Sequence, residues 1–146
     1  MKIIFNDNTE KTVFLVMGEQ MLVQGANRDT LTFVFDDTYT LDELDNLFTE
    51  SRCEKIILVD DTQIDVDGNI IAEAYSVHSG YTVRAGIEKV LELSDEKGEN
   101  GENVYINRLK VKMSQRTYME NQLKNLQEEL INTQLALLDL YEGGLE

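Results

Sequence analysis

Short runs of alternating apolar and polar residues dominate residues 1–93 and predict β-strands, because successive side chains of a strand point to opposite faces. Thr30–Phe35 is the clearest run, with Leu31, Phe33 and Phe35 on one face. The turn-forming Asn6–Lys11 predicts a hairpin between the first two strands, and Gly25–Asp29 predicts a polar break. The predicted strands are Lys2–Phe5, Thr12–Val16, Met21–Gln24, Thr30–Phe35, Lys55–Asp60, Ile70–Val77 and Tyr81–Leu93.

A short helix interrupts these strands. Thr40 and Glu43 have the spacing of a capping box, in which each side chain bonds the backbone N–H of the other residue. Apolar residues then follow at helical spacing, so Leu41–Thr49 is predicted to be an amphipathic helix. Ser94–Asn103 has no large apolar residue and predicts a loop or hairpin tip, after which Val104–Met113 alternates as a further strand.

The final part of the chain has a different period. Arg116–Glu142 is an uninterrupted helical pattern, with Thr117 and Glu120 as a second capping box and Gly143 and Gly144 after it. Its apolar residues recur at the a and d positions of a heptad, the spacing of a coiled coil. The a positions are Leu123, Leu130 and Leu137, and the d positions are Met119, Leu126, Thr133 and Leu140.

A second apolar stripe on this helix lies outside the a/d seam. Ile131, Leu135 and Leu138 follow the helical repeat on another face, which a two-stranded coiled coil would leave exposed. Further copies of the helix, the rest of the chain or a different protein could each cover this stripe. The e and g positions are nearly uncharged, so pairing of identical helices is permitted, and the number of helices stays open. The predicted contact residues are Met119, Leu123, Leu126, Leu130, Ile131, Leu135, Leu137, Leu138 and Leu140.

These elements predict an α+β fold. We expect a mainly antiparallel β-domain with one short helix at residues 1–113, followed by a long coiled-coil-like helix at residues 114–146 that oligomerises or docks. A chain of 146 residues suits one domain with an appendage, and 42% apolar residues are enough to form a packed core.

Charge and cysteine content narrow the possible partners. The net charge of −15 repels phosphate backbones and anionic lipid, so nucleic acid and membrane surfaces are poor partners. The charge mainly indicates solubility, although docking on a basic patch is an alternative. Cys53 is the only cysteine, so an intrachain disulfide is impossible, which suits assembly in a reducing cytoplasm.

No catalytic motif emerges from the sequence, and we expect neither an enzyme, nor a cofactor, nor a metal. Gln63–Ala74 resembles the beginning of an EF-hand loop but lacks the acidic residue that closes it, so a turn is the preferred interpretation. His78 lacks a catalytic context, and we expect it at a surface or strand end. Basic neighbours could lower the pKa of Cys53, but its place before a buried strand favours a structural thiol.

Basic residues are concentrated on one predicted strand. Arg108, Lys110 and Lys112 share one face of Val104–Met113, although the protein is acidic. We expect this face to be solvated and to pair with acidic side chains of the adjacent strand. The alternative is a docking stripe for an acidic partner.

Three segments carry a resemblance to a group of known proteins: MKIIFNDNTE, QGANRDTLTFVF and LKNLQEELINTQLALLDLYEGGLE. They resemble small proteins encoded with the tail or baseplate genes of phages and prophages of Gram-positive bacteria, which tend to combine a β-rich region with a terminal helix and a short glycine tail. The resemblance implies a structural role in a tail-like particle and supplies no catalytic residues.

The leading hypothesis is therefore a virion protein of the tail, baseplate or tail fibre, assembled in the host cytoplasm. Its expected partners are copies of itself, other tail, baseplate or fibre proteins, or both. One alternative is an assembly chaperone that is not retained in the particle. Another is a phage-encoded inhibitor of a host protein, whose acidic surface could mimic nucleic acid.

Overall fold

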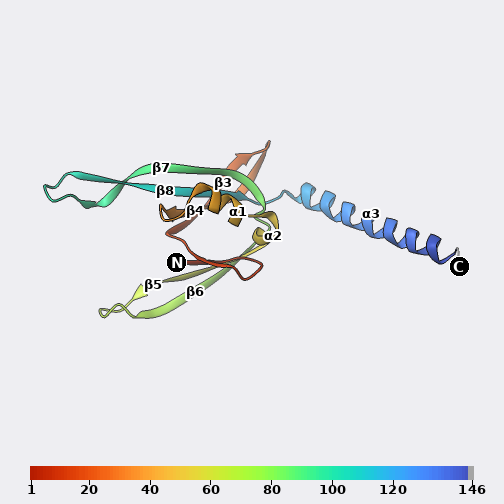
Figure 1. Cartoon of the computed structure of the whole chain (residues 1–146), viewed down its shortest axis with the longest axis horizontal. Helices are drawn as coiled ribbons and strands as arrows, with labels where there is room; N and C mark the ends of the chain where they lie inside the picture. The colour runs from red at the N-terminus through yellow and green to blue at the C-terminus, as the bar shows by residue number, and fades with distance from the viewer. Residues whose placement is uncertain (145–146) are drawn as a thin grey trace. The chain divides into compact units, whose positions relative to one another are not determined.

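The structure, a computed structural model, describes residues 1–144 and has the predicted α+β fold. Two antiparallel four-stranded sheets and two short helices precede a long C-terminal helix (Figure 1). The chain forms two compact units, with the boundary between Gln115 and Arg116. The segment predicted as 114–146 ends in Leu145 and Glu146, which lie outside the described residues.

The first sheet has the strand order β2-β1-β5-β6, and the second has the order β3-β4-β8-β7. Two long hairpins, β5–β6 and β7–β8, extend beyond the core (Figure 1). The strands are β1 (Lys2–Ile4), β2 (Glu10–Thr12), β3 (Leu15–Val23), β4 (Ala26–Asp36), β5 (Lys55–Ile64), β6 (Ile70–Ser79), β7 (Val83–Lys97) and β8 (Asn103–Ser114), and the helices are α1 (Leu41–Leu47), α2 (Glu50–Cys53) and α3 (Tyr118–Gly143).

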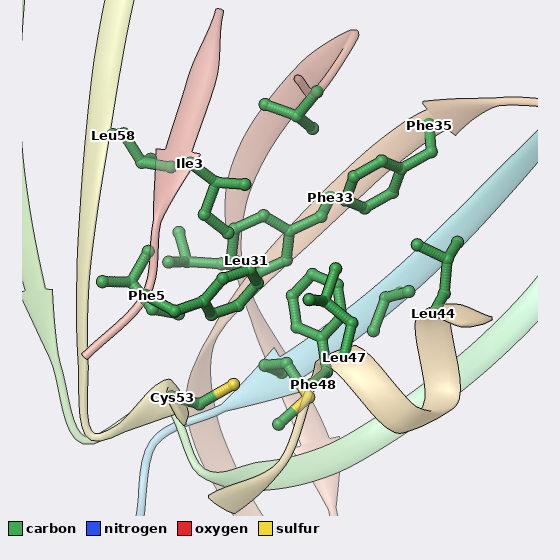
Figure 2. Close-up of a cluster of buried hydrophobic side chains, with 14 of the residues drawn as sticks. Ile3, Phe5, Leu31, Phe33, Phe35, Leu44, Leu47, Phe48, Cys53 and Leu58 are labelled. Carbon is green, nitrogen blue, oxygen red and sulfur yellow. The ribbon is translucent and has the colours of Figure 1, made fainter. Parts of the chain in front are cut away.

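The core lies between the two sheets, with α1 and the residue after it on one side (Figure 2). Phe48 joins these layers, because its ring centroid lies 5.2 Å from that of Phe5, 5.0 Å from Phe33 and 5.9 Å from Phe35. The alternation predicted for Thr30–Phe35 is confirmed, since Leu31, Phe33 and Phe35 all point into this core. Ring pairs at these distances add to the stabilisation that burial provides.

The predicted helix Leu41–Thr49 is present as α1, and a second short helix follows it. Thr40 begins α1 with the predicted capping box: Glu43 N donates to Thr40 Oγ1 at 3.1 Å, and Thr40 N donates to Glu43 Oε2 at 3.3 Å. A second helix, α2, was not predicted. It begins at another N-cap, Thr49, whose hydroxyl accepts from Arg52 N. Four residues are too few to show a helical period, so only the cap could have indicated α2.

The hairpin prediction for the first strands was partly wrong. β1 pairs with β2, but the residues predicted as Thr12–Val16 are divided between the two sheets, because β2 ends at Thr12 and β3 begins at Leu15. Phe14 lies at this crossing, where its backbone N–H donates to Val34 O at 2.8 Å. A change of sheet within a short apolar run leaves no mark in the alternation pattern.

The predicted polar break at Gly25–Asp29 was also wrong. Gln24 and Gly25 alone form the turn, both with positive φ (49° and 78°), and β4 begins directly afterwards. A two-residue loop with these dihedrals matches the twist of an antiparallel hairpin. Arg28 then lies buried within β4, where its Nε donates to Val23 O at 2.9 Å and its Nη1 donates to Gln115 O at 3.2 Å. These carbonyl partners make a buried arginine tolerable in a strand.

The Ser94–Asn103 segment is a hairpin tip, as expected, but the tip is shorter than predicted. Lys97 pairs with Asn103, so β7 and β8 continue into the polar segment. Gly98 N donates to Glu102 O at 2.9 Å, and Gly101 takes the positive φ of 76° that closes the turn.

Candidate interaction surface

The long helix α3 begins and ends where the sequence predicts. Thr117 Oγ1 accepts from Glu120 N at 3.2 Å and Thr117 N donates to Glu120 Oε1 at 3.3 Å, which confirms the second capping box. Gly144 is the C-cap, and its N–H donates to Leu140 O at 3.0 Å. The 26 residues between these caps form one uninterrupted helix. A helix of this length can persist with less help from packing than a short one needs.

All predicted contact residues lie on α3, and none of them is buried. The exposed fraction of the nine side chains ranges from 52% at Leu138 to 72% at Leu140. Taking a leucine side chain out of water stabilises a protein by about 1.5–3 kcal/mol. Covering this row of exposed side chains with another apolar surface would therefore be strongly favourable. Such rows on soluble proteins mark contact surfaces.

The exposed residues form two stripes rather than one. Ile131 follows Leu130 directly, so it lies about 100° around the helix from that seam residue, and the second stripe is on a different face. Because this stripe contains only Ile131, Leu135 and Leu138, it is confined to the C-terminal half of α3. The N-terminal half therefore offers one apolar face, and the C-terminal half offers two.

Thr133 is the one polar residue at a d position, and its hydroxyl is already satisfied. Its Oγ1 donates to Glu129 O, one turn earlier, at 2.9 Å. Burial of Thr133 in a helical seam would therefore leave no unpaired hydroxyl. Covering the seam at Thr133 would therefore not add the free-energy cost of burying an unpaired hydroxyl.

Cys53, one of the residues considered for chemistry, belongs to the hydrophobic core. Cys53 is fully buried in α2, and this burial raises the pKa of its thiol to about 12, although Arg84 and Arg52 act in the opposite direction. The thiolate, which is the reactive form, is therefore scarce at neutral pH. The expectation of a structural thiol is confirmed, and basic neighbours do not activate it.

The EF-hand-like segment is the turn between β5 and β6. Asp65 Oδ1 accepts from the backbone N–H groups of Asp67 and Asn69, each at 2.9 Å, so this carboxylate stabilises the turn itself. These bonds hold the pKa of Asp65 below its usual value, the bonds to Asn69 contributing most. His78 lies near the end of β6, where its Nε2 is 3.1 Å from Ser76 Oγ, as expected for a strand-end histidine.

Residues 1–144 contain neither a cluster of metal ligands nor a membrane-spanning helix. Within that range, no group of three or more His, Cys, Asp or Glu side chains is placed to hold a metal ion. None of the helices described there is long and apolar enough to cross a bilayer.

The basic stripe of β8 is largely engaged within its own sheet. Lys110 Nζ lies 2.5 Å from Glu92 Oε1 on the neighbouring strand β7. The guanidinium carbon of Arg108 lies 3.8 Å from the ring centroid of Phe14, in a cation–π contact. These contacts support the interpretation of a solvated face that pairs with acidic neighbours, and they weaken the alternative of a docking stripe.

A further exposed surface, on β6, was not predicted from the sequence. Nine of the ten residues of β6 are exposed, and among them Tyr75 is 65% and Val77 59% accessible. The alternation of Ile70–Val77 predicts a strand and two faces, but it gives no sign that this strand lies at the edge of its sheet. Only the strand order reveals that position.

Comparisons with protein-family models, with curated proteins and with solved structures found no match to this chain. The function is therefore inferred from the residues of the chain itself.

Proposed function

We propose that this protein is a non-enzymatic structural component of a phage tail, baseplate or tail-like particle, attached or oligomerised through α3. The observation that carries the proposal is the exposure of all nine apolar contact residues along a capped 26-residue helix. The phage setting is supported by the resemblance of the three sequence segments described above. The high negative charge is compatible with this role, since it keeps an unassembled subunit soluble.

In this proposal the two units have different roles: residues 1–115 form the folded body, and α3 makes the contacts. Residues 1–115 bury their own apolar core and so provide a stable body. The a/d seam of α3 packs against the same seam of other copies, and the second stripe receives a further helix or a neighbouring particle protein. Burial of these side chains drives attachment, and the energy gained exceeds the cost of ordering a helix that is already capped.

The first test is the paired substitution Leu126→Asp with Leu130→Asp in the full chain. Two carboxylates in the seam remove at least about 3 kcal/mol of burial per helix, which predicts association weakened by at least about a hundredfold. Analytical ultracentrifugation over a range of concentrations measures the change. Near-ultraviolet circular dichroism should show that the aromatic core of the body is unchanged.

The matched control is Asn125→Asp with Asn132→Asp, which adds the same charge to the polar face of α3. This variant should associate like the original protein. An unchanged oligomer in the leucine variant, or equal losses in both variants, would show that the seam is not the contact surface.

The second test concerns the particle. The full-length protein should be present in purified, washed particles at a fixed ratio to a major tail protein, as measured by quantitative mass spectrometry. Presence in infected lysate with absence from finished particles would overturn the structural role and indicate an assembly chaperone instead.

A further inference from the structure

The strand β6 is an exposed edge of the first sheet. It pairs with β5 on one side, and among the described residues no strand pairs with its other side. In Figure 1 this hairpin extends away from the core, with β6 as its outer strand. The outer backbone N–H and C=O groups of an edge strand form a template on which a further strand can pair.

Unlike the edge strands β2 and β7, β6 has few features that oppose such pairing. The edge strand β7 has seven charged residues among its fifteen, and β2 is only three residues long. Irregularities do not distinguish β6 from β7, because the ladder of each contains them, near Gln63 for β5–β6 and near Gly86 for β7–β8. Charges, irregularities and shortness are the usual means by which edges avoid association. Glu73 is the only charged residue among the ten of β6, and the chain has no proline.

The lone charge of β6 has a partner on its own strand. Tyr75 Oη donates to Glu73 Oε2 at 2.6 Å, and both side chains are on the surface. Because the two residues are neighbours on one face, this pair places a carboxylate and a phenol side by side at the sheet edge. A second strand with the same pair in the reverse order would be complementary to it.

Strand geometry restricts how β6 can pair with its own copy. Only every second residue of an edge strand directs its N–H and C=O groups outward. In an antiparallel pair related by a two-fold axis, one residue faces its own copy, so any two residues that face each other are an even number of positions apart in the sequence. Two such registers keep all but one residue of β6 in the ladder. One register places Ala74 opposite Ala74 of the second copy, and the other places Tyr75 opposite Tyr75.

The two registers differ in what faces Glu73. With Ala74 on the axis, each Glu73 faces Tyr75 of the other copy, so each phenol O–H can donate to the carboxylate of either strand, and the two carboxylates lie apart. With Tyr75 on the axis, each Glu73 faces Val77, which offers no hydrogen bond. Opposite polar partners stabilise a cross-strand pair, so the first register is favoured.

The same reasoning disfavours the edge strand β3. Its central register would place Glu19 opposite its own copy, with Gly18 beside it. Like charges directly opposite each other destabilise a strand pair, and glycine weakens a strand interior.

We propose that β6 pairs antiparallel with β6 of a second copy of this chain, with Ala74 on the two-fold axis, so that two first sheets join into one. This contact is separate from α3 and uses a different surface of the protein. It also brings the exposed Tyr75 and Val77 of both copies into one continuous apolar face.

Cysteine cross-linking of the full chain tests the register. Ala72, Ala74 and Ser76 are all exposed, so Ala72→Cys, Ala74→Cys and Ser76→Cys can each be made singly. A disulfide requires Cα atoms within about 7 Å, a distance that directly opposite residues satisfy. The native Cys53 is buried and does not compete.

Under mild oxidation, the Ala74→Cys protein should form a disulfide-linked dimer at least about tenfold faster than either other variant alone. Residue 72 faces residue 76, so each lies about 13 Å along the strand from its own copy. A mixture of Ala72→Cys and Ser76→Cys should therefore form the mixed dimer. Non-reducing electrophoresis and mass spectrometry of the linked peptides provide the measurement.

The absence of the Ala74→Cys dimer would overturn the proposal, as would equal rates for all three single variants. Preferential linkage between Ala74→Cys and Ser76→Cys would overturn the stated register, because those positions are opposite only when Tyr75 is on the axis. Circular dichroism of each variant confirms that the exposed substitution leaves the fold intact.

Discussion

The β-body and the helix α3 are built from similar apolar residues but use them differently. In residues 1–115 the large side chains meet one another, and Phe33, Phe35 and Ile56 have no accessible surface. The helix α3 is rich in leucine, yet it has no buried residue. The body therefore encloses an apolar core of its own, although some of its apolar side chains remain exposed, whereas no side chain of the helix is enclosed. Exposure of ordered apolar side chains is thus the clearest functional signal of the molecule.

The two regions also share one local motif, the capping box at the start of a helix. Thr40 and Glu43 begin α1, and Thr117 and Glu120 begin α3, with nearly identical bond lengths. The consequence differs, because α1 has only seven residues and relies on the burial of Leu44 and Leu47. The same local chemistry therefore stabilises a packed element in one region and an exposed rod in the other.

The largest expected effect comes from removing a core ring. Phe48→Ala deletes the side chain that meets three other phenylalanines, and it should lower the unfolding free energy of the body by about 3–5 kcal/mol. Leu130→Ala in α3 should change that quantity by less than about 0.5 kcal/mol, since surface substitutions rarely exceed this. Urea unfolding followed by near-ultraviolet circular dichroism measures both. Similar losses in the two variants would show that α3 supports the body.

Removing the N-cap of α1 or of α3 should have a smaller effect than removing Phe48, and the effect should differ between the two regions. Thr40→Ala should destabilise the body by about 1 kcal/mol, because α1 is part of the core. Thr117→Ala should leave the body unchanged and instead reduce the far-ultraviolet helical signal and the association of α3. A body equally destabilised by both substitutions would contradict this division.

Lowering the pH should reveal a smaller contribution to the stability of the body, from the hydrogen bond between Asp7 and Arg52. Arg52 Nε donates to Asp7 Oδ2 at 2.8 Å, and this bond is the main cause that lowers the pKa of Asp7 from 3.8 to about 2. A carboxyl with a lowered folded-state pKa stabilises the fold above pH 3.8, and this stabilisation is lost as the pH falls towards 2.

Between these pH values, Asp7→Asn should therefore show a smaller decrease in melting temperature than the original protein. High salt should reduce the difference, because the pair is exposed. An identical decrease in both proteins would show that the Asp7–Arg52 bond does not contribute in solution.

The smallest effect is expected at the tip of the β7–β8 hairpin. Deletion of Gly98–Gly101 removes only exposed or half-exposed residues outside the core, so the unfolding free energy should change by less than about 0.5 kcal/mol. Thermal unfolding by circular dichroism measures it. A loss above about 2 kcal/mol, roughly that of a buried side chain, would assign a structural role to this tip.

Much of the fold was predictable because local rules were strong. Both capping boxes and the continuous period of residues 118–143 predict helices that the structure contains, and the alternation of Thr30–Phe35 predicts its buried face. The misplacements occur where local rules conflict. Arg28 is polar but lies in a buried strand, where the Val23 and Gln115 carbonyls accept its N–H groups, and the latter partner is distant in sequence.

The candidate surface shows the same division. The seam of α3 follows from periodicity, which is a property of consecutive residues. The β6 edge does not, because the alternation of Ile70–Val77 is the same whether a strand is central or at an edge. The strand order of the sheet places β6 at the edge, with β5 as its neighbour on one side, and this order depends on how the whole chain folds.

The sequence by itself therefore determined the α+β class, the capped terminal helix and the two apolar stripes, since these depend on spacing along the chain. Only the tertiary structure decided which apolar side chains are enclosed, that Cys53 is buried beyond easy ionisation, and that β6 has one side without a strand among the described residues. Burial and edge position are created when segments distant in sequence meet, and no local pattern contains that information.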